Sequence, residues 1–212
     1  MNVVFALDMS ESVSGRTLDA LRHGVDAVAR GLRTGDQTAL VTFNHRVSLG
    51  AALSADVSRL TAALSSIAPT GATSLVDALY ASLWIAEPDP GRAVVIVFSD
   101  GVDTASWLTA DRVVDAARRA DAVVYAVTTR GGRRNPFLAE LTETTGGRTF
   151  DVSSSDRLTD AFESILAEFR QRYVIAYSPT GVKAAGWHTL DLRVRGRRAS
   201  VKTRQGYLAG PN

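Results

Sequence analysis

Oxygen-bearing side chains stand in three short segments of the sequence, and together they could hold a hard divalent cation. The candidate metal ligands are Asp8, Ser10, Ser12, Thr73 and Asp100. This set has two carboxylates and three hydroxyls but no thiol or imidazole, so it favours magnesium, with manganese or calcium as alternatives, over zinc or copper. Because few of these ligands carry charge, the ion would keep much of its positive charge. Such an ion is expected to attract an acidic ligand.

The elements around these residues predict that they meet at one edge of a sheet. Residues 3–7 (VVFAL) form an apolar run typical of a buried parallel strand, and Asp8 follows at its carboxyl end. Side chains two positions apart on an extended chain point to the same side, which aligns the two serines with this aspartate. A TGAT loop supplies Thr73, and the apolar run 93–98 ends shortly before Asp100. Open parallel sheets bind ligands beyond the carboxyl ends of their strands, so the three segments should converge.

Strands and helices alternate along most of the chain. Apolar runs predict strands near 3–7, 38–43, 46–50, 93–98, 122–128 and 148–152. Apolar residues at spacings of three and four predict helices near 18–32, 57–67, 74–86, 109–119, 136–144 and 156–170. This alternation predicts an α/β fold with a doubly wound, mostly parallel sheet and helices on both of its faces.

The pattern changes after Arg170. Residues 172–178, 187–195 and 199–204 read as three strands without intervening helices, so a small antiparallel β extension is expected at 171–212 after an α/β domain at 1–170. Alternating Leu190, Leu192 and Val194 give the second of these strands an apolar side. A small isolated sheet is marginal in water, so we expect this side to dock on the domain, and in a longer parent chain to pair with strands upstream of Met1.

The three polar segments resemble the metal-ion-dependent adhesion site of von Willebrand factor A domains and integrin I domains. The shared features are D-x-S-x-S after the first strand, a G-x-T loop before a helix, and an apolar strand ending in S-D-G, within residues 3–170. The resemblance implies a Rossmann-like sheet ordered 3-2-1-4-5-6. It also implies that the five candidate ligands hold the ion directly or through water, that a partner's carboxylate completes the coordination, and that the domain binds protein rather than catalysing a reaction.

The C-terminal sequence resembles a narrower group within that family. The segments SDGVDTAS, QRYVIAYSPTG and VKTRQGY look like an acidobacterial-type subgroup with a short β-rich extension, which implies a bacterial and often secreted or cell-surface parent. Glu11 departs from the family pattern, which often has glycine there. Its charge is expected either to tighten metal binding or to repel an acidic partner. Arg130, Arg133 and Arg134 follow a strand at the same edge and either form a solvated loop or help to attract acidic partners.

The composition limits the other classes of function. Hydrophobic residues make up 45% and charged residues 22% of 212 residues, which is typical of globular proteins. No apolar run approaches the roughly 20 residues of a membrane span, so membrane insertion is not expected. The net charge of +2 comes without a basic run or zinc-finger spacing, so nucleic acid is not an expected partner. The opening MNVVFALD predicts a strand, not a signal peptide, and neither localisation nor oligomeric state follows from the sequence.

Two other functions compete with protein binding. A haloacid-dehalogenase-type phosphatase would also use magnesium and an aspartate after a strand, but Ser10 replaces its second aspartate and neither Lys183 nor Lys202 stands before an acidic pair. The other alternative is a structural domain with a vestigial site, in which the Asp8 segment only caps a helix or stabilises a turn.

Several neighbouring residues have simpler interpretations. Ser74 and Asp77 match an S-x-x-D capping box at a helix start. Asp103 is expected to be a solvated loop carboxylate rather than a group supporting the ion. Three aromatic residues occupy core-like positions, namely Trp84, Phe98 and Phe162.

Overall fold

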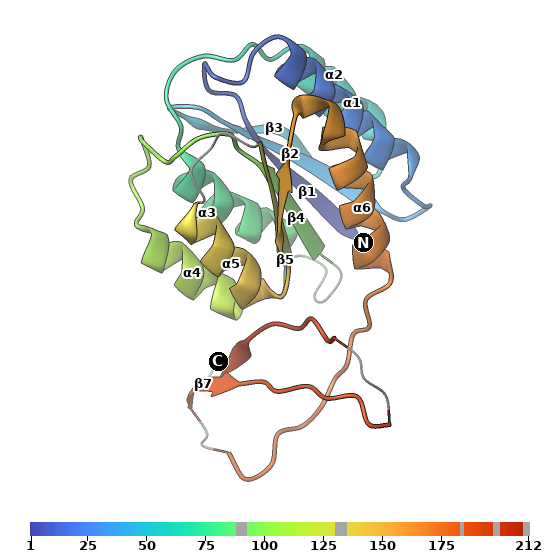
Figure 1. Ribbon diagram of the computed structural model, residues 1–212, viewed down its shortest axis with the longest axis vertical. Helices are drawn as coiled ribbons and strands as arrows, with labels where there is room; N and C mark the ends of the chain where they lie inside the picture. The colour runs from blue at the N-terminus through green and yellow to red at the C-terminus, as the bar shows by residue number, and fades with distance from the viewer. Residues whose placement is uncertain (88–92, 130–134, 183–184, 197–199, 210–212) are drawn as a thin grey trace.

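A computed structural model describes residues 1–87, 93–129, 135–182, 185–196 and 200–209. Its main feature is a six-stranded sheet ordered β3-β2-β1-β4-β5-β6, which confirms the expected order. The strands are β1 (Asn2–Asp8), β2 (Gln37–Phe43), β3 (Val47–Ser54), β4 (Ala93–Phe98), β5 (Val123–Thr129) and β6 (Thr149–Val152). Only β3 runs antiparallel to its neighbour, so the carboxyl ends of five strands meet at one edge (Figure 1).

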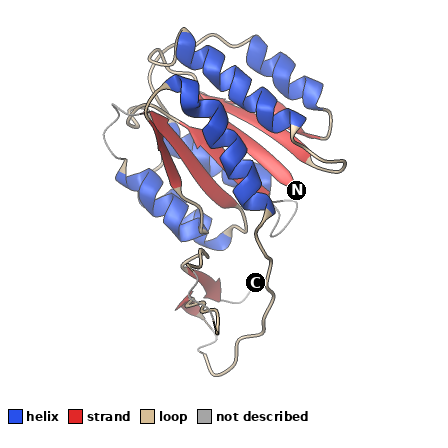
Figure 2. Cartoon of the chain, turned by 45° about the vertical axis from the view of Figure 1, so that its right-hand side comes forward, coloured by secondary structure: helices blue, strands red, loops and turns tan. Residues whose placement is uncertain are grey.

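Helices cover both faces of the sheet, as predicted (Figure 2). They are α1 (Arg16–Arg30), α2 (Val57–Ser65), α3 (Leu75–Ala86), α4 (Ala110–Arg119), α5 (Pro136–Thr145) and α6 (Leu158–Arg170), with a short 3-10 turn at Ser155–Arg157. The central strand β1 contributes side chains to two hydrophobic cores, one on each face of the sheet. Its residues Val3, Phe5 and Leu7 pack with α1, α2 and α6, whereas Val4 and Ala6 pack with α3, α4 and α5. Burial on both faces explains why the strand reads as a continuous apolar run.

The aromatic residues divide between core and surface. Phe98 and Phe162 are fully buried, as expected from their positions in apolar segments. The expectation for Trp84 is wrong, because 59% of this residue is exposed on α3. Its ring lies against the edge of Tyr80, with 6.4 Å between ring centroids. Helix α3 is apolar over most of its surface, so the sequence pattern did not separate its outward side from its buried side.

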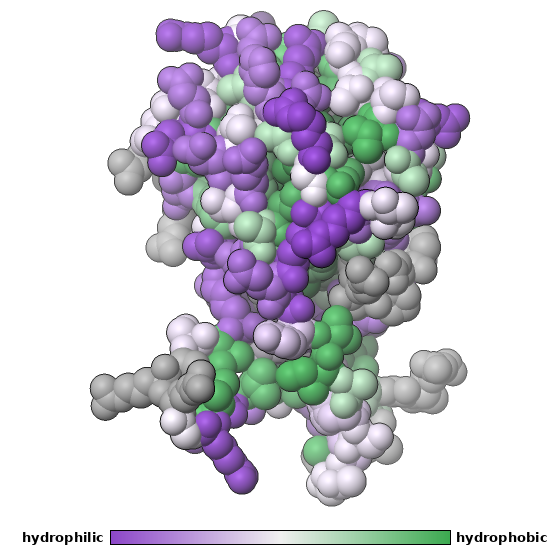
Figure 3. All heavy atoms as spheres, turned by 90° about the vertical axis from the view of Figure 1, so that its right-hand side faces the viewer, coloured by the Kyte–Doolittle hydropathy of each residue, from purple (hydrophilic) through white to green (hydrophobic). Residues whose placement is uncertain are grey.

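The C-terminal extension forms two strands instead of the three expected. Strands β7 (Gly186–Thr189) and β8 (Gly206–Ala209) pair antiparallel, whereas the described residues of 172–178 and 200–204 form no strand. Tyr173, Val174 and Ile175 are exposed by 91%, 71% and 64%. Figure 3 shows apolar side chains gathered on the surface of this part of the molecule. Apolar residues in these segments favour strands, but within the described residues no neighbouring strand pairs with them to complete the backbone hydrogen bonds.

The extension docks on the domain with a different surface from the one predicted. Leu190 is only partly buried, and Leu192 and Val194 are exposed by 46% and 49%, so the predicted face is not buried against the domain. Instead, Arg204 donates hydrogen bonds to the Arg118 carbonyl (2.8 Å) and to the Asp121 carboxylate (3.3 Å) at the end of α4. The Arg118 guanidinium lies 5.3 Å from the centre of the Trp187 ring. Pairing with strands upstream of Met1 remains a prediction.

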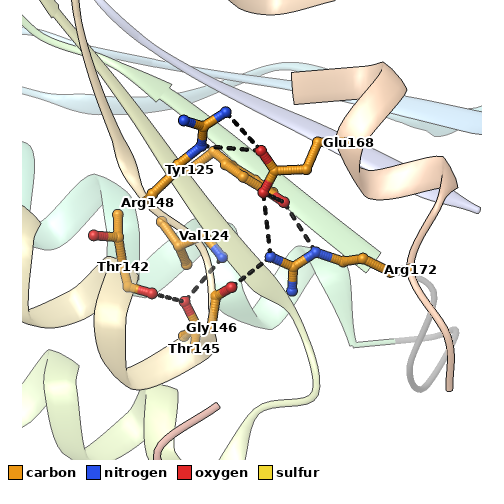
Figure 4. A network of polar contacts seen from close by, with 8 residues as sticks. All are labelled: Val124, Tyr125, Thr142, Thr145, Gly146, Arg148, Glu168 and Arg172. Carbon is orange, nitrogen blue, oxygen red and sulfur yellow. Dashed lines mark hydrogen bonds and ion pairs between the residues drawn. The ribbon is translucent and has the colours of Figure 1, made fainter. Parts of the chain in front are cut away.

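A polar network fixes the point where the chain leaves α6 (Figure 4). The Tyr125 hydroxyl donates to Glu168 (2.9 Å) and accepts from Arg172 (3.0 Å). Arg148 pairs with the same glutamate at 2.7 Å. Burial raises the pKa of Glu168, but hydrogen bonds from Tyr125 and Arg148 outweigh it and hold the pKa below its ordinary value. The first residues of the extension are therefore anchored to both β5 and α6.

Deletion of residues 173–212 should test this docking surface while leaving the network at Arg172 in place. The truncated chain loses the contacts of Arg204 and Trp187, which together are worth about 1–2 kcal/mol. We expect the melting temperature to fall by roughly 3–6 °C in differential scanning calorimetry. Binding of a hydrophobic dye should also decrease, because the deletion removes the exposed apolar residues that begin at Tyr173.

The variant Arg204→Ala in the full-length chain is the matched control. It should lower the melting temperature in the same direction but keep the dye binding, since the apolar residues remain. Equal melting temperatures for the truncated and full-length chains would show that the extension is an independent module.

Candidate metal centre

The first segment of the site begins where β1 ends. Asp8 is the last residue of β1 and lies in register with Phe43 of β2. The backbone then leaves the sheet but stays clamped, because the Met9 amide donates to the Phe43 carbonyl (2.7 Å) and the Glu11 amide donates to the Gly71 carbonyl (3.1 Å). The segment 8–12 is therefore held between the end of β2 and the loop that precedes α3.

Four of the five candidate ligands form one hydrogen-bonded group. One carboxylate oxygen of Asp8 accepts from the Ser10 amide (2.9 Å). The hydroxyls of Ser10 and Ser12 lie 3.1 Å apart, and Ser12 donates to the Asp100 carboxylate at 2.9 Å. The other oxygen of Asp8 accepts from the Ser99 hydroxyl (2.7 Å), which sequence reasoning placed in the segment but did not assign to the aspartate.

Thr73 approaches the same group from the loop before α3. A Cβ built on Gly101 would lie 3.7 Å from the Thr73 hydroxyl, which places this hydroxyl beside the Asp100 segment. The Thr73 amide donates to the Thr104 hydroxyl (3.1 Å), and its carbonyl accepts from the amides of Thr104 and Ala105 (2.9 and 3.0 Å). The structure thus brings all five predicted residues to one edge of the sheet. Their role as metal ligands remains a prediction.

The electrostatics of Asp8 fit a cation. Asp8 is fully buried. In the described part of the chain, no Lys, Arg or His forms an ion pair with Asp8 or with Asp100. Burial raises the pKa of Asp8, hydrogen bonds from Ser10 and Ser99 act against the rise, and the charge of Asp100 adds to it. A buried carboxylate is costly unless it is paired or binds a metal.

The types of donor atom also limit which ion this site could bind. Among the described residues, no three His, Cys, Asp or Glu side chains gather as a metal-binding group. Two carboxylates therefore have to be supplemented by the hydroxyls of Ser10, Ser12 and Thr73. An all-oxygen set of this kind suits a hard cation such as magnesium and fits the ion implied by the sequence.

The capping-box interpretation of Ser74 and Asp77 is wrong. Ser74 makes no side-chain hydrogen bond to the start of α3. Asp103 takes that role, because its carboxylate accepts from the Val76 amide (3.1 Å), so it is not merely a solvated loop residue. The Asp77 carboxylate instead accepts from the amides of Trp107 and Leu108, both at 2.9 Å. These pairs join residues about 30 positions apart, a separation that local sequence patterns do not reveal.

Other features lie around the site. Glu11 is exposed beside the candidate ligands. A groove of about 340 Å³ opens next to Met9 and is lined by Phe43, Asn44 and Arg46, among others. Arg130, Arg133 and Arg134, which the sequence places on the same edge, lie outside the described residues.

None of the helices in the described part of the chain is long and apolar enough to cross a membrane.

Comparison with solved structures supports the fold. The von Willebrand factor type A protein from Catenulispora acidiphila is 17% identical and superposes with a TM-score of 0.73 over 82% of this chain and 43% of its own. The hypothetical protein BatB from Bacteroides thetaiotaomicron is 18% identical, with a TM-score of 0.65 over 81% of this chain and 100% of its own.

A third similar structure is proximal thread matrix protein 1 from the mussel byssus, with a zinc-occupied MIDAS motif. It is 22% identical, with a TM-score of 0.63 over 78% of this chain and 44% of its own. This chain thus spans less than half the length of the Catenulispora and mussel chains.

Sequence comparison identifies the family. No curated protein matches the chain significantly. The family model for the von Willebrand factor type A domain matches residues 2–164, which include every candidate ligand and most of the α/β domain. The chain therefore belongs to the von Willebrand factor type A domain family.

Proposed function

We propose that this chain is a divalent-metal-dependent protein-binding domain, with magnesium, or else manganese or calcium, held by Asp8, Ser10, Ser12, Thr73 and Asp100. The observation that carries the proposal is a fully buried Asp8 carboxylate, close to a second carboxylate and without a cationic partner among the described residues. Domains of this family are typically adhesion and interaction domains, and the zinc-occupied motif of the mussel protein shows that a related fold can hold a divalent ion.

The residues at the site would have different roles in binding the ion. Asp8 and Asp100 supply the negative charge, and Ser99 orients Asp8 through its hydrogen bond of 2.7 Å. The three hydroxyls bind without neutralising the ion further. When bound, the ion supplies a positive charge at the surface, which an Asp or Glu carboxylate from a protein partner can approach. A parent protein of this kind would act by adhesion, and we propose a secreted or cell-surface location for it.

A phosphatase is the second candidate, and the residues at the site do not favour it. Ser10 takes the place of the second aspartate. Lys202 belongs to the C-terminal extension and lies near Glu168 and Glu143, and Lys183 lies outside the described residues. No described lysine therefore stands at the Asp8 edge to bind a phosphate.

Selection from a peptide library tests the proposed function. A phage-displayed random library is panned on the full chain in magnesium and eluted with EDTA. We expect the recovered peptides to share an Asp or Glu and to lose binding to the Asp100→Asn variant. Peptides that bind equally well in EDTA would contradict the proposal. The same protein should not hydrolyse p-nitrophenyl phosphate, and a turnover that depends on Asp8 would favour the phosphatase instead.

A further inference from the structure

The loop formed by residues 101–108 is fixed to the start of α3 by several hydrogen bonds. At one end, the amides of Thr104 and Ala105 donate to the Thr73 carbonyl. In the middle, the Asp103 carboxylate accepts from both an α3 amide and the Ser106 hydroxyl. At the other end, Asp77 of α3 accepts from the amides of Trp107 and Leu108. The backbone of this loop is therefore held in one conformation next to Thr73.

This fixed loop exposes large apolar side chains. Trp107 is 95% exposed, Val102 56% and Leu108 36%. Within the described residues, the Trp107 ring makes no aromatic or cation-π pair. Three exposed apolar side chains within one segment of seven residues, 102–108, favour an interaction site over single scattered apolar residues. Tryptophan is enriched among the residues that contribute most to binding between proteins. A loop that is already ordered also loses little conformational entropy when a partner binds.

The position of the loop connects it to the metal centre. It begins directly after Asp100, and its backbone bonds to Thr73, so two candidate ligands border it. We propose that Trp107 is the anchor for a polypeptide partner whose Asp or Glu approaches the ion and whose adjacent apolar residues cover the indole. This inference rests on the proposed function and adds the chemistry that flanks the partner's carboxylate.

The charges around the loop define the partner further. Glu11 is exposed on the same edge, and Asp77, Asp100 and Asp103 contribute further carboxylates. These described carboxylates disfavour an anionic membrane and a run of acidic residues next to the loop, because like charges repel. The partner segment is therefore a single carboxylate flanked by apolar residues, not an acidic stretch.

The test uses magnesium-dependent peptides recovered from the random library and the full chain. Trp107→Ala should weaken their binding by at least about 30-fold in fluorescence polarisation, the loss typical of a dominant interface tryptophan. Its magnesium affinity should equal that of the natural chain. Trp84→Ala is the matched control. This tryptophan is also exposed, but it lies about 14 Å along α3 from Leu75, the first residue of the helix, at the usual rise per residue. Its peptide binding should not change.

The outcomes separate this inference from the function on which it rests. Magnesium-dependent peptides that bind Trp107→Ala as tightly as the natural chain would overturn the anchor but leave the metal-dependent function standing. A library that yields no magnesium-dependent peptide would overturn both. Binding to vesicles of phosphatidylcholine and phosphatidylglycerol that disappears in Trp107→Ala would overturn the polypeptide partner in favour of a membrane surface.

Discussion

Replacing Asp8 with asparagine should lower magnesium affinity by at least about 100-fold, since loss of a residue that merely supports a ligand already costs about 10–100-fold. Asparagine keeps the shape of the side chain, and its amide can still pair with the Ser10 amide and the Ser99 hydroxyl. It removes the buried negative charge that we assign to the ion. The loss should therefore reflect the charge rather than a disrupted fold, which a thermal melt in EDTA would verify.

Isothermal titration calorimetry with magnesium, and with manganese as a second ion, measures this effect. Ser99→Ala should give an intermediate loss of about 10–100-fold, because it removes the hydrogen bond that orients Asp8. Glu11→Gln is the matched control. This glutamate is exposed and is not one of the five candidate ligands, so the magnesium affinity should stay within about threefold, because exposed charge pairs contribute little. If Asp8→Asn binds magnesium as well as the natural chain, the assignment of the site is wrong.

Gly147→Ala should destabilise the domain by at least about 4 kcal/mol, in the range that single substitutions reach only when they disrupt the core. Gly146 ends α5 in the left-handed conformation with φ of 79°. The Gly147 amide then donates to the Thr142 carbonyl at 2.7 Å, which completes a Schellman motif. A Cβ on Gly147 would lie only 1.8 Å from the backbone oxygen of Val124 in β5. Alanine must therefore force the backbone away from β5.

Urea denaturation of both proteins in EDTA measures the free energy of unfolding. Gly101→Ala is the control, because its Cβ would meet only the Thr73 hydroxyl, at an ordinary contact distance of 3.7 Å. Its stability should stay within about 0.5 kcal/mol of the natural chain. A similarly small change for Gly147→Ala would mean that the loop between α5 and β6 adapts without cost.

The sequence by itself determined the α/β domain and the edge at which the site lies. The four central strands β1, β2, β4 and β5 contain short apolar runs, and most helices have an apolar stripe, so local patterns were enough to predict these elements. A parallel sheet places the carboxyl ends of neighbouring strands together. Asp8 ends β1 and Asp100 follows β4. The family resemblance implied the strand order that makes β1 and β4 neighbours, and the structure confirms it.

The tertiary structure alone decided the features that depend on contacts between distant segments. Asp103 and Asp77 accept hydrogen bonds from backbone amides that join α3 to the loop after β4. Gly147 has to be glycine because a side chain there would collide with the Val124 carbonyl of β5. Trp107 is exposed because that loop is held against α3. The extension follows the same principle. Its alternating residues are compatible with three strands, but a strand forms only where a partner completes its hydrogen bonds, and only β7 and β8 have one among the described residues of the extension.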